Sequence, residues 1–442
     1  MAQAFFGGVH PNDMKAATNE KAIEQLSPPP AQVVIPMSMH FGAPCTPIVS
    51  VGDYVKVGQK IGEFKGLGAP IHASVSGKVV AIEPRPYSMG GNMTSVVIEN
   101  DYQNTVSEEV KAPADPNALT TEEMIEIVKN AGIVGMGGAT FPTHVKISGG
   151  IGQVTTVIIN GAECEPYITS DTRTMLDRSQ EVLEGARLVQ HFLQVKRVIF
   201  AIEDNKPRCI QLYRKLTKDE DGMEVCALKS LYPQGGEKVL IYNTIGEIVP
   251  EGKLPLDVGA IVLNCTTLAN IARYCKTGMP LVEKCITVDG SAVAKPKNVI
   301  VPIGMKLADV FEQSGGFCAE PKKVLYGGPM MGIAVPDLDQ PVLKNTNAVL
   351  AMTEADAVLP EPTACIRCGR CVGVCPMHLM PVLMYQATQD GDVDGMKSVN
   401  LLDCIECGCC AYTCPASVPL VLGFRAGKQM IRNAAAREKA KA

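Results

Sequence analysis

Two runs of cysteine near the C-terminus constrain this chain more than any other part of its sequence. The first run reads Cys365-x2-Cys368-x2-Cys371-x3-Cys375-Pro376, and the second reads Cys404-x2-Cys407-x2-Cys410-x3-Cys414-Pro415. Three closely spaced thiolates in one loop can bind three irons of a cubane cluster, and the cysteine beside proline then binds the other cluster. The spacing therefore predicts two [4Fe–4S] clusters, one bound by Cys365, Cys368, Cys371 and Cys414 and the other by Cys404, Cys407, Cys410 and Cys375.

Zinc is the main alternative for a cysteine pattern of this kind. Structural zinc sites bring four ligands together as two pairs, whereas here a triplet and a Cys-Pro pair occur twice. Thiolate ligands also suit the soft iron of a cluster. Cys409 adds a further thiol to the second run and is interpreted as a residue that binds no iron. The chain is therefore predicted to transfer electrons.

The composition argues against several other classes of protein. With 442 residues the chain is too long for a single core, and about three or four domains are expected. A net charge of −5 without a basic stripe disfavours nucleic acid as a partner. No run of 18 apolar residues is present and the N-terminus does not read as a signal peptide, so neither a membrane span nor secretion is expected. Its 17 cysteines are then expected to be metal ligands or buried thiols.

The N-terminal part of the chain predicts an arm, a small β domain and a linker. Residues 1–30 form the arm, whose closing Ser-Pro-Pro-Pro favours an extended chain without regular structure. Residues 31–100 alternate short β-rich segments with Gly and Pro, which is typical of a small all-β domain. Its segments GDYVKVGQKIG and APIHASVSGKV resemble the barrel-sandwich of biotinyl and lipoyl domains. Lys65 lacks the neighbours of a modified lysine, so no swinging arm is expected. Residues 101–118 are polar and contain two prolines, and they are predicted to be a linker.

The middle of the chain predicts an α/β domain over residues 119–280. A helix, TEEMIEIVKNAG, is expected to begin at a Thr120 or Thr121 cap. The strand VTTVIIN, a helix over 177–194 and the strand RVIFAIED then follow one another. Strand, helix and strand at this spacing predict a βαβ unit with a parallel sheet.

The last third of the chain predicts a β-grasp and then the cluster domain. Residues 281–352 contain a strand–turn–strand pair, a helix and a further strand, the order of a β-grasp module. Residues 353–362 link this module to residues 363–442, a helical domain of the bacterial-ferredoxin 2[4Fe–4S] type that ends in a helix. The final helix carries several basic residues, which indicates a solvated face or a surface that docks on a membrane-bound partner.

A glycine-rich loop near the start of the α/β domain indicates a cofactor site. Residues 131–146 read AGIVGMGGATFPTHVK. Glycines let backbone N–H groups approach a phosphate or a flat ring, and Lys146 adds a positive charge. The loop differs from the dinucleotide fingerprint G-x-G-x-x-G because Thr140 replaces the last glycine, and glycine-rich loops are often plain turns. Taken alone, the loop leaves both possibilities open.

Three later segments, together with this loop, resemble the flavoprotein subunit of respiratory complex I. They read NGAECEP at 160–166, GGEK at 235–238 and NCTTLAN at 264–270. The resemblance implies that FMN is bound by residues of the glycine-rich loop, NGAECEP and NCTTLAN: Gly135, Gly137, Gly138, Lys146, Asn160, Glu163, Cys164, Asn264 and Thr267. It also implies that NADH is the substrate and lies against Phe141, Glu165 and Glu237, with Glu165 and Glu237 as the catalytic residues, and that Gly235 belongs to the cofactor site.

This chain departs from the complex I pattern at four positions. Met136 stands in place of an arginine, Ala162 in place of an aspartate, and Gly236 and Thr266 in place of glutamates. These departures remove charges that would contact a nucleotide, so the residues around FMN are better defined than those around NADH. Ordinary exposed acids on a turn are the alternative for Glu163 and Glu165.

The complete order of segments resembles the RnfC family, a component of Rnf electron-transport complexes, over essentially the full chain. The order is an N-terminal FFGGVHP, a lipoyl-like β domain, a complex-I-like flavin domain, a β-grasp and the doubled cluster motif. The resemblance implies a peripheral subunit on the cytoplasmic face of a bacterial inner membrane, with the other subunits as partners. The complex would act as a translocase that couples electron flow between ferredoxin and NAD⁺ to ion transport. Electrons would pass between NAD(H), FMN and two [4Fe–4S] clusters, because a flavin can exchange electrons with both kinds of centre.

Two alternatives remain open from the sequence. A cobalamin reductase of the propanediol-utilisation type shares the flavin, β-grasp and cluster modules, although FFGGVHP favours the Rnf family. A ferredoxin-like carrier with an inactive flavin site is the second alternative, because of the four departures. The presence of flavin and its bleaching by NADH would separate an enzyme from a carrier.

Overall fold

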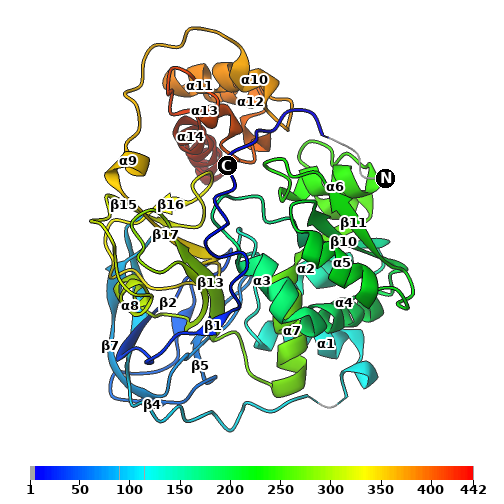
Figure 1. The fold of residues 1–442 in the computed structure, drawn as a ribbon, viewed down its shortest axis with the longest axis vertical. Coiled ribbons are helices and arrows are strands. Elements are labelled where there is room, and N and C mark those ends of the chain that lie inside the picture. The colour runs from blue at the N-terminus through cyan, green and yellow to red at the C-terminus, as the bar shows by residue number, and fades with distance from the viewer. Residues whose placement is uncertain (1–4, 89, 114, 442) are drawn as a thin grey trace.

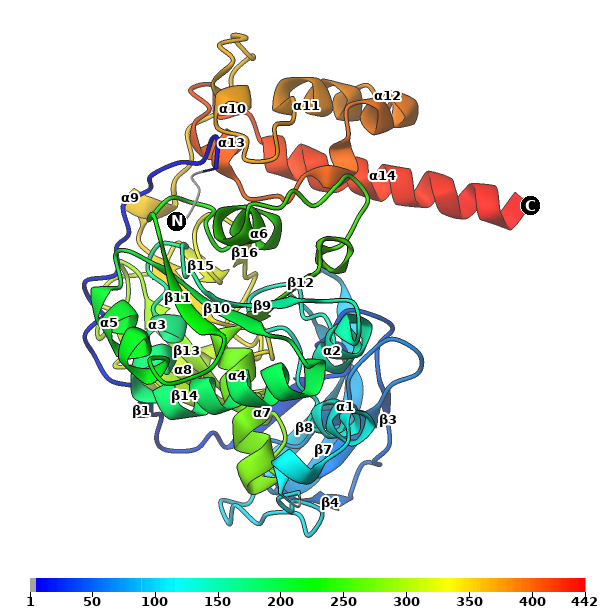
Figure 2. The same cartoon turned by 90° about the vertical axis from the view of Figure 1, so that its right-hand side faces the viewer.

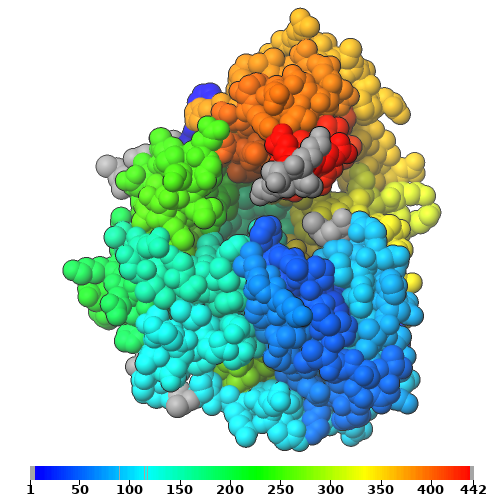
Figure 3. Space-filling view, turned by 180° about the vertical axis from the view of Figure 1, so that it is seen from behind, coloured from blue at the N-terminus to red at the C-terminus, as the bar shows by residue number. Residues whose placement is uncertain are grey.

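The structure is a computed structural model that describes residues 5–88, 90–113 and 115–441. In Figure 1 the α/β domain lies on the right, the two β domains lie on the left and the cysteine-rich domain lies at the top. The N-terminal arm runs down the middle of this view, between the α/β domain and the β domains. Figure 3 shows from behind that the domains pack against one another, with the cysteine-rich domain above the other three.

The first β domain consists of two small antiparallel sheets, with strand orders β2-β8-β7-β4 and β3-β5-β6. The strands are β2 (Gln32–Pro36), β3 (Thr46–Pro47), β4 (Tyr54–Val55), β5 (Lys60–Glu63), β6 (Ile71–His72), β7 (Gly77–Pro86) and β8 (Asn92–Asn100). Val79 is buried whereas Lys78 and Val80 are exposed, as expected of a strand with one face on a core. Lys65 is exposed in the turn between β5 and β6, where the hairpin tip was predicted.

The α/β domain is built on a parallel sheet with strand order β11-β10-β9-β12. Its elements are α1 (Thr121–Asn130), α2 (Thr143–Gly150), β9 (Thr156–Gly161), α3 (Ser170–Asp177), α4 (Ser179–Leu193), β10 (Arg197–Glu203), α5 (Pro207–Leu216), β11 (Met223–Leu228), α6 (Glu237–Ile245), β12 (Ala260–Asn264) and α7 (Cys265–Thr277). The chain builds outward from β9 to β11 and then adds β12 on the other side of β9. The order therefore reverses between β9 and β12, and the crevice at the carboxyl ends of such strands is the usual ligand site of open α/β sheets.

Helices cover both faces of this sheet, because successive residues of its central strands are buried on opposite sides. Ile158 of β9 packs in a cluster with Leu240 of α6, whereas Val157 belongs to the main core together with residues of α4 and α7. Such continuous burial is typical of parallel sheets. Thr120 caps α1 as predicted: it accepts a hydrogen bond from the Glu123 N–H at 3.2 Å, and Glu123 accepts one from the Thr120 N–H at 2.7 Å.

The β-grasp sheet has the strand order β1-β14-β13-β17-β15-β16. Its elements are β13 (Glu283–Asp289), β14 (Lys297–Pro302), α8 (Leu307–Gln313), β15 (Lys323–Tyr326), β16 (Ile333–Ala334) and β17 (Ala348–Met352), followed by α9 (Glu354–Ala357). The edge strand β1 (Glu24–Gln25) comes from the N-terminal arm and pairs in parallel with β14. The arm was expected to lack regular structure, but this short pairing attaches it to the β-grasp.

In the cysteine-rich domain, both runs of cysteine fold in the same way. Its helices are α10 (Arg370–Gly373), α11 (Pro381–Gln389), α12 (Val393–Ser398), α13 (Cys409–Tyr412) and α14 (Leu420–Lys441). α10 and α13 occupy equivalent positions, each directly after a glycine with positive φ, namely Gly369 (75°) and Gly408 (82°). α14 is the predicted basic helix, and Figure 2 shows that it extends beyond the rest of the domain. Within the described part of the chain, none of the helices has the length and apolar character needed to span a membrane.

Candidate functional site

Two asparagines mark the crevice at the switch point of the parallel sheet. Asn160 near the end of β9 and Asn264 at the end of β12 are register partners. Asn264 caps α7, because its side-chain oxygen accepts hydrogen bonds from the N–H groups of Thr266 (2.9 Å) and Thr267 (3.3 Å). The Asn160 amide donates to the Gly235 carbonyl at 3.0 Å. Three of the predicted segments therefore meet at this crevice.

The glycine-rich loop lies directly above the start of α7. The Met136 N–H donates to the Thr267 hydroxyl at 3.2 Å, and a Cβ built on Gly137 would lie 3.5 Å from the Asn264 side chain. Gly138 has a φ of +148°, and a Cβ built there would meet no atom within 4 Å. A phosphate or a flat ring binds well where glycine backbone borders open space at the start of a helix. The loop therefore fits a bound FMN.

An ion pair joins α2 to α6, two helices that begin within the predicted segments. Lys146 on α2 and Glu237 at the start of α6 form an ion pair, with 27% and 41% of their side chains exposed. The structure thus brings together the lysine predicted for FMN and the glutamate predicted for NADH. Phe141 lies nearby in the loop and packs on Phe41 of the first β domain, with ring centroids 5.9 Å apart.

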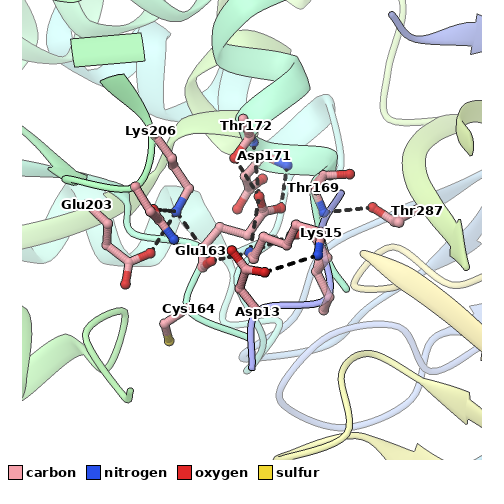
Figure 4. A network of polar contacts seen from close by, with 12 residues as sticks. Asp13, Lys15, Glu163, Cys164, Thr169, Asp171, Thr172, Glu203, Lys206 and Thr287 are labelled. Carbon is pink, nitrogen blue, oxygen red and sulfur yellow. Dashed lines mark hydrogen bonds and ion pairs between the residues drawn. The ribbon is translucent and has the colours of Figure 1, made fainter. Parts of the chain in front are cut away.

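The turn after β9 is held from below by a buried network of polar groups (Figure 4). The Glu163 carboxylate accepts hydrogen bonds from the N–H groups of Asp171 (2.7 Å) and Thr172 (3.2 Å) at the start of α3. Lys15 of the N-terminal arm lies 4.0 Å from this carboxylate, and burial raises the pKa of Glu163 despite the lysine. In the structure the Glu163 carboxylate caps the start of α3, and its place beside a flavin stays a prediction.

Cys164 and Glu165 point from this turn toward other parts of the chain. The Cys164 thiol accepts a hydrogen bond from the Gly235 N–H at 3.4 Å, so the turn and the 235–237 loop are joined a second time. Glu165 accepts hydrogen bonds from the N–H groups of Met330 (3.1 Å) and Met331 (2.8 Å) in the β-grasp. Burial raises the pKa of Glu165 to about 7. This carboxyl therefore changes charge near neutral pH.

The four cysteines predicted for the second cluster line one cavity. These are Cys375, Cys404, Cys407 and Cys410, and Met384 and Phe424 are among the apolar side chains around them. Cys409 lines the same cavity, and several thiols around apolar walls suit a [4Fe–4S] cluster. For the first cluster, Cys365 and Cys368 are exposed, whereas Cys371 and Cys414 are half-buried. The two sites thus differ in their access to solvent.

The second cysteine run packs against the loop that follows β11. The Tyr232 hydroxyl donates to the Cys407 carbonyl at 2.7 Å, and the Cys409 thiol lies 3.8 Å from the Tyr232 carbonyl oxygen. Lys238 also lies 3.8 Å from Asp403. Cys409, interpreted as a residue that binds no iron, is fully buried at this contact. The second cluster site therefore adjoins the flavin crevice, through the loop from Tyr232 to Glu237.

Several residues at the site were not predicted. Asp171 accepts hydrogen bonds from Asn264 (2.7 Å) and Thr266 (2.6 Å), and Asn345 of the β-grasp donates to the Gly138 carbonyl at 3.4 Å. Both lie outside the motifs, and no local pattern marks them. Tyr232 lies three residues before the predicted GGEK segment. Its position in the turn before that segment was the signal in the sequence that could have indicated a role for it.

Models of known families match four successive stretches of the chain. Residues 3–103 match the RnfC barrel sandwich hybrid domain, and residues 128–273 match the Nuo51 FMN-binding domain. Residues 285–334 match the SLBB domain, and residues 357–415 match the 4Fe-4S dicluster domain. The predicted fold class is therefore confirmed, and the cofactors of the chain are FMN and two [4Fe–4S] clusters.

Full-length relatives decide the family. The chain is 44% identical over 429 residues to the RnfC component of the Na⁺-translocating ferredoxin:NAD⁺ oxidoreductase complex of Acetobacterium woodii, which covers 97% of both chains. It is also 44% identical over 444 residues to the corresponding component of the proton-translocating complex of Clostridium ljungdahlii, which covers 100% of this chain and 97% of the relative. The chain belongs to the RnfC family. The predicted resemblance is thus confirmed, and the chain is an electron-transfer subunit of an oxidoreductase complex.

Two solved structures with low sequence identity to this chain share its fold. An NAD⁺-reducing [NiFe]-hydrogenase in the H₂-reduced state matches 72% of this RnfC chain and 63% of its own chain, with a TM-score of 0.51 and 17% identity. The air-oxidised state of such a hydrogenase matches 62% of this chain and 55% of its own, with a TM-score of 0.50 and 18% identity. At this identity the match supports the architecture alone.

Proposed function

We propose that this protein passes electrons between NAD(H), FMN and its two [4Fe–4S] clusters as a peripheral subunit of an ion-translocating ferredoxin:NAD⁺ oxidoreductase. The observation that carries the proposal is the hydrogen bond from the Tyr232 hydroxyl to the Cys407 carbonyl, because it joins the second cysteine run to the loop that leads into Gly235 and Glu237. A pure carrier would not need a crevice and a cluster site in contact. The names of the relatives, subunits of Na⁺- and proton-translocating complexes, support the wider role.

The residues around the crevice divide the work of binding FMN. Gly138 leaves open space beside exposed backbone, and Gly137 lies against Asn264 at the start of α7. Lys146 supplies a mobile positive charge for the phosphate. Asn160 and Cys164 hold the Gly235 loop against the end of β9, which keeps the wall of the crevice in place. FMN held by these residues would supply the chemistry that exchanges a hydride with a nicotinamide and single electrons with a cluster.

The NADH side of the crevice has fewer charged residues than the complex I pattern. Glu237 is half-exposed at the crevice edge and is free to accept a ribose hydroxyl once Lys146 turns toward a phosphate. Phe141, packed on Phe41, offers a ring face for the adenine. Glu165 is turned toward the β-grasp, so its role is to fix the Met330–Met331 loop beside the second cluster.

The exposure of the thiols predicted for each cluster supports one order of electron transfer. The second cluster site lies next to the flavin crevice, and the thiols predicted for the first cluster include the two exposed ones, Cys365 and Cys368. Electrons from NADH would then pass through the second cluster first and leave by the first cluster, with the reverse path toward NAD⁺. The attachment to a bacterial inner membrane, on its cytoplasmic side, would come from protein partners.

Two experiments test this function. Anaerobic NADH should bleach both the flavin and the cluster absorbance of the purified protein, and artificial acceptors should restore them. A protein that holds full clusters without affinity for FMN would contradict the proposal in favour of a carrier.

The second experiment concerns the complex. The protein should sediment with membranes when its integral partners are present and remain in the supernatant when they are deleted. Unchanged location after this deletion, together with efficient NADH-dependent reduction of a cobalamin, would contradict the proposal.

A further inference from the structure

The N-terminal arm contains the FFGGVHP motif. The proposed electron transfer between the cofactors does not explain why the chain has this motif. We propose that this arm positions the second cluster against the flavin crevice, with Gly7, Gly8 and Val9 setting the separation that electrons cross. The inference rests on the proposed function for the source of the electrons. The arrangement of the arm itself rests on contacts within the described chain.

The motif is bonded to both sides of the junction. The Gly8 N–H donates to the carbonyl of Val374, the residue directly before the cluster ligand Cys375, at 2.9 Å. Val9 and Tyr232 exchange two backbone hydrogen bonds of 2.9 and 3.0 Å, and Tyr232 in turn donates to the Cys407 carbonyl. Two consecutive residues of the arm therefore connect the loop of one cluster ligand to the turn that leads into the flavin crevice.

The two glycines of the motif are required by both conformation and space. Gly7 and Gly8 have φ values of +85° and +78°, which side chains rarely adopt. A Cβ on Gly7 would lie 2.9 Å from the Val374 carbonyl carbon, and one on Gly8 would lie 2.7 Å from the Tyr232 carbonyl oxygen. In both cases the neighbour is backbone and cannot turn aside. Any side chain at these positions must push the cluster loop or the flavin turn outward.

The arm is anchored again farther along the chain. The Lys15 ammonium is buried under the flavin turn, where it donates to the carbonyls of Glu163 (2.5 Å) and Ile168 (2.6 Å), as Figure 4 shows from close by. Beyond it, the Thr18 carbonyl accepts a hydrogen bond from Asn298 of the β-grasp at 3.1 Å. A segment fixed on both sides of the junction can hold the two sites at one separation.

The experiment compares two alanine substitutions in the full-length protein with all cofactors bound. Gly8→Ala introduces the clash with Tyr232, whereas Gly66→Ala is a matched control, because Gly66 also has a positive φ (+71°) but faces open space. Flavin reduction by NADH, followed by stopped flow, should be unchanged in both variants. Cluster reduction should be slower in Gly8→Ala than in both the wild type and Gly66→Ala, because the clash with the Tyr232 carbonyl separates the arm from the flavin turn.

Hydrogen exchange supplies a readout that does not depend on turnover. Amides of residues 230–236 and 404–410 should exchange faster in Gly8→Ala than in the wild type, and at the wild-type rate in Gly66→Ala. Phe6→Ala is a second perturbation without backbone strain, because Phe6 stacks on His378 of the cluster domain at 5.1 Å. It should shift both readouts in the same direction by a smaller amount.

The outcomes separate this inference from the proposed function. If NADH does not reduce the flavin of the wild-type protein, the proposed function fails, and photochemical reduction of the flavin then starts the same comparison of cluster reduction. Equal cluster reduction and equal exchange in Gly8→Ala and Gly66→Ala would overturn the role of the arm.

Discussion

Lys146 and Glu237 form an ion pair. We predict that removing the Glu237 charge strengthens FMN binding and that removing the Lys146 charge weakens it. With 27% and 41% of the side chains exposed, such a pair contributes about 0.5–1 kcal/mol. Lys146 must give up this interaction before it can bind a phosphate. Glu237→Gln removes the competition, so FMN should bind about two to five times more tightly, the ratio that corresponds to about 0.5–1 kcal/mol.

The other half of the pair should behave in the opposite way. Lys146→Met removes a charge-assisted hydrogen bond to the phosphate, which typically contributes about 1.5–3 kcal/mol. The dissociation constant of FMN should then rise by about 10–150-fold. Glu237→Gln should also raise the KM for NADH, because it removes an acceptor for the ribose, whereas Lys146→Met should leave that KM unchanged in protein saturated with FMN.

The assay is titration of flavin-free protein with FMN, followed by quenching of flavin fluorescence at low and high salt. Glu126→Gln is a matched control, since Glu126 pairs with Lys129 on α1 at 3.0 Å with comparable exposure, away from the crevice. This control should not alter FMN affinity. Equal weakening of FMN in Glu237→Gln and Lys146→Met would show that the pair only stabilises the fold and would refute the assignment of Lys146.

Three further predictions concern the clusters, the loop and pH. Cys375→Ser should lose the second cluster and leave about half of the iron, whereas Cys409→Ser should keep both cubane signals in electron paramagnetic resonance. Gly138→Leu should abolish FMN binding in the same fluorescence titration, because its side chain would enter the open space beside the loop, and retained affinity would contradict this. Burial raises the pKa of Glu165 from 4.5 to about 7, so between these pH values the folded state keeps a proton that the unfolded state has released, and stability should fall by about 3 kcal/mol as the pH rises. Glu165→Gln should remove this slope from urea unfolding measured across the window, and an unchanged slope would contradict the cause.

Local patterns in the sequence carried the predictions that the comparisons confirm. Cysteine spacing specifies a dicluster domain because three of the four ligands of each cubane are close in the chain and the Cys-Pro pair that supplies the fourth occurs in both runs. The strands around Asn160 were recognisable because buried parallel strands are continuously apolar. Asn160 and Asn264 then meet at one crevice because the carboxyl ends of neighbouring parallel strands share an edge.

Contacts between distant segments could not be predicted in this way. Glu163 belongs to a motif that indicates a flavin wall, yet the structure uses its carboxylate to cap α3, eight and nine positions farther along the chain. Asn345 reaches the glycine loop from the β-grasp across a sequence separation of 207 residues. Such pairings depend on how whole domains pack, and no pattern within either segment reports them.

Buried lysines give a physical reason why the domains of this chain keep one arrangement. Lys344, between β16 and β17, is fully buried and donates to the carbonyls of Pro70 in the first β domain and Gly132 at the base of the glycine loop, both at 2.7 Å. Lys15 connects the arm to the flavin turn in the same manner. An ammonium group in such a place is costly to bury unless every acceptor is in position. If one domain moves slightly away, the lysine ammonium loses a carbonyl acceptor. Water cannot replace this acceptor until the interface between the domains has opened far enough to admit it. Intermediate separations are therefore disfavoured, and electron transfer between sites on different domains requires this kind of fixed spacing.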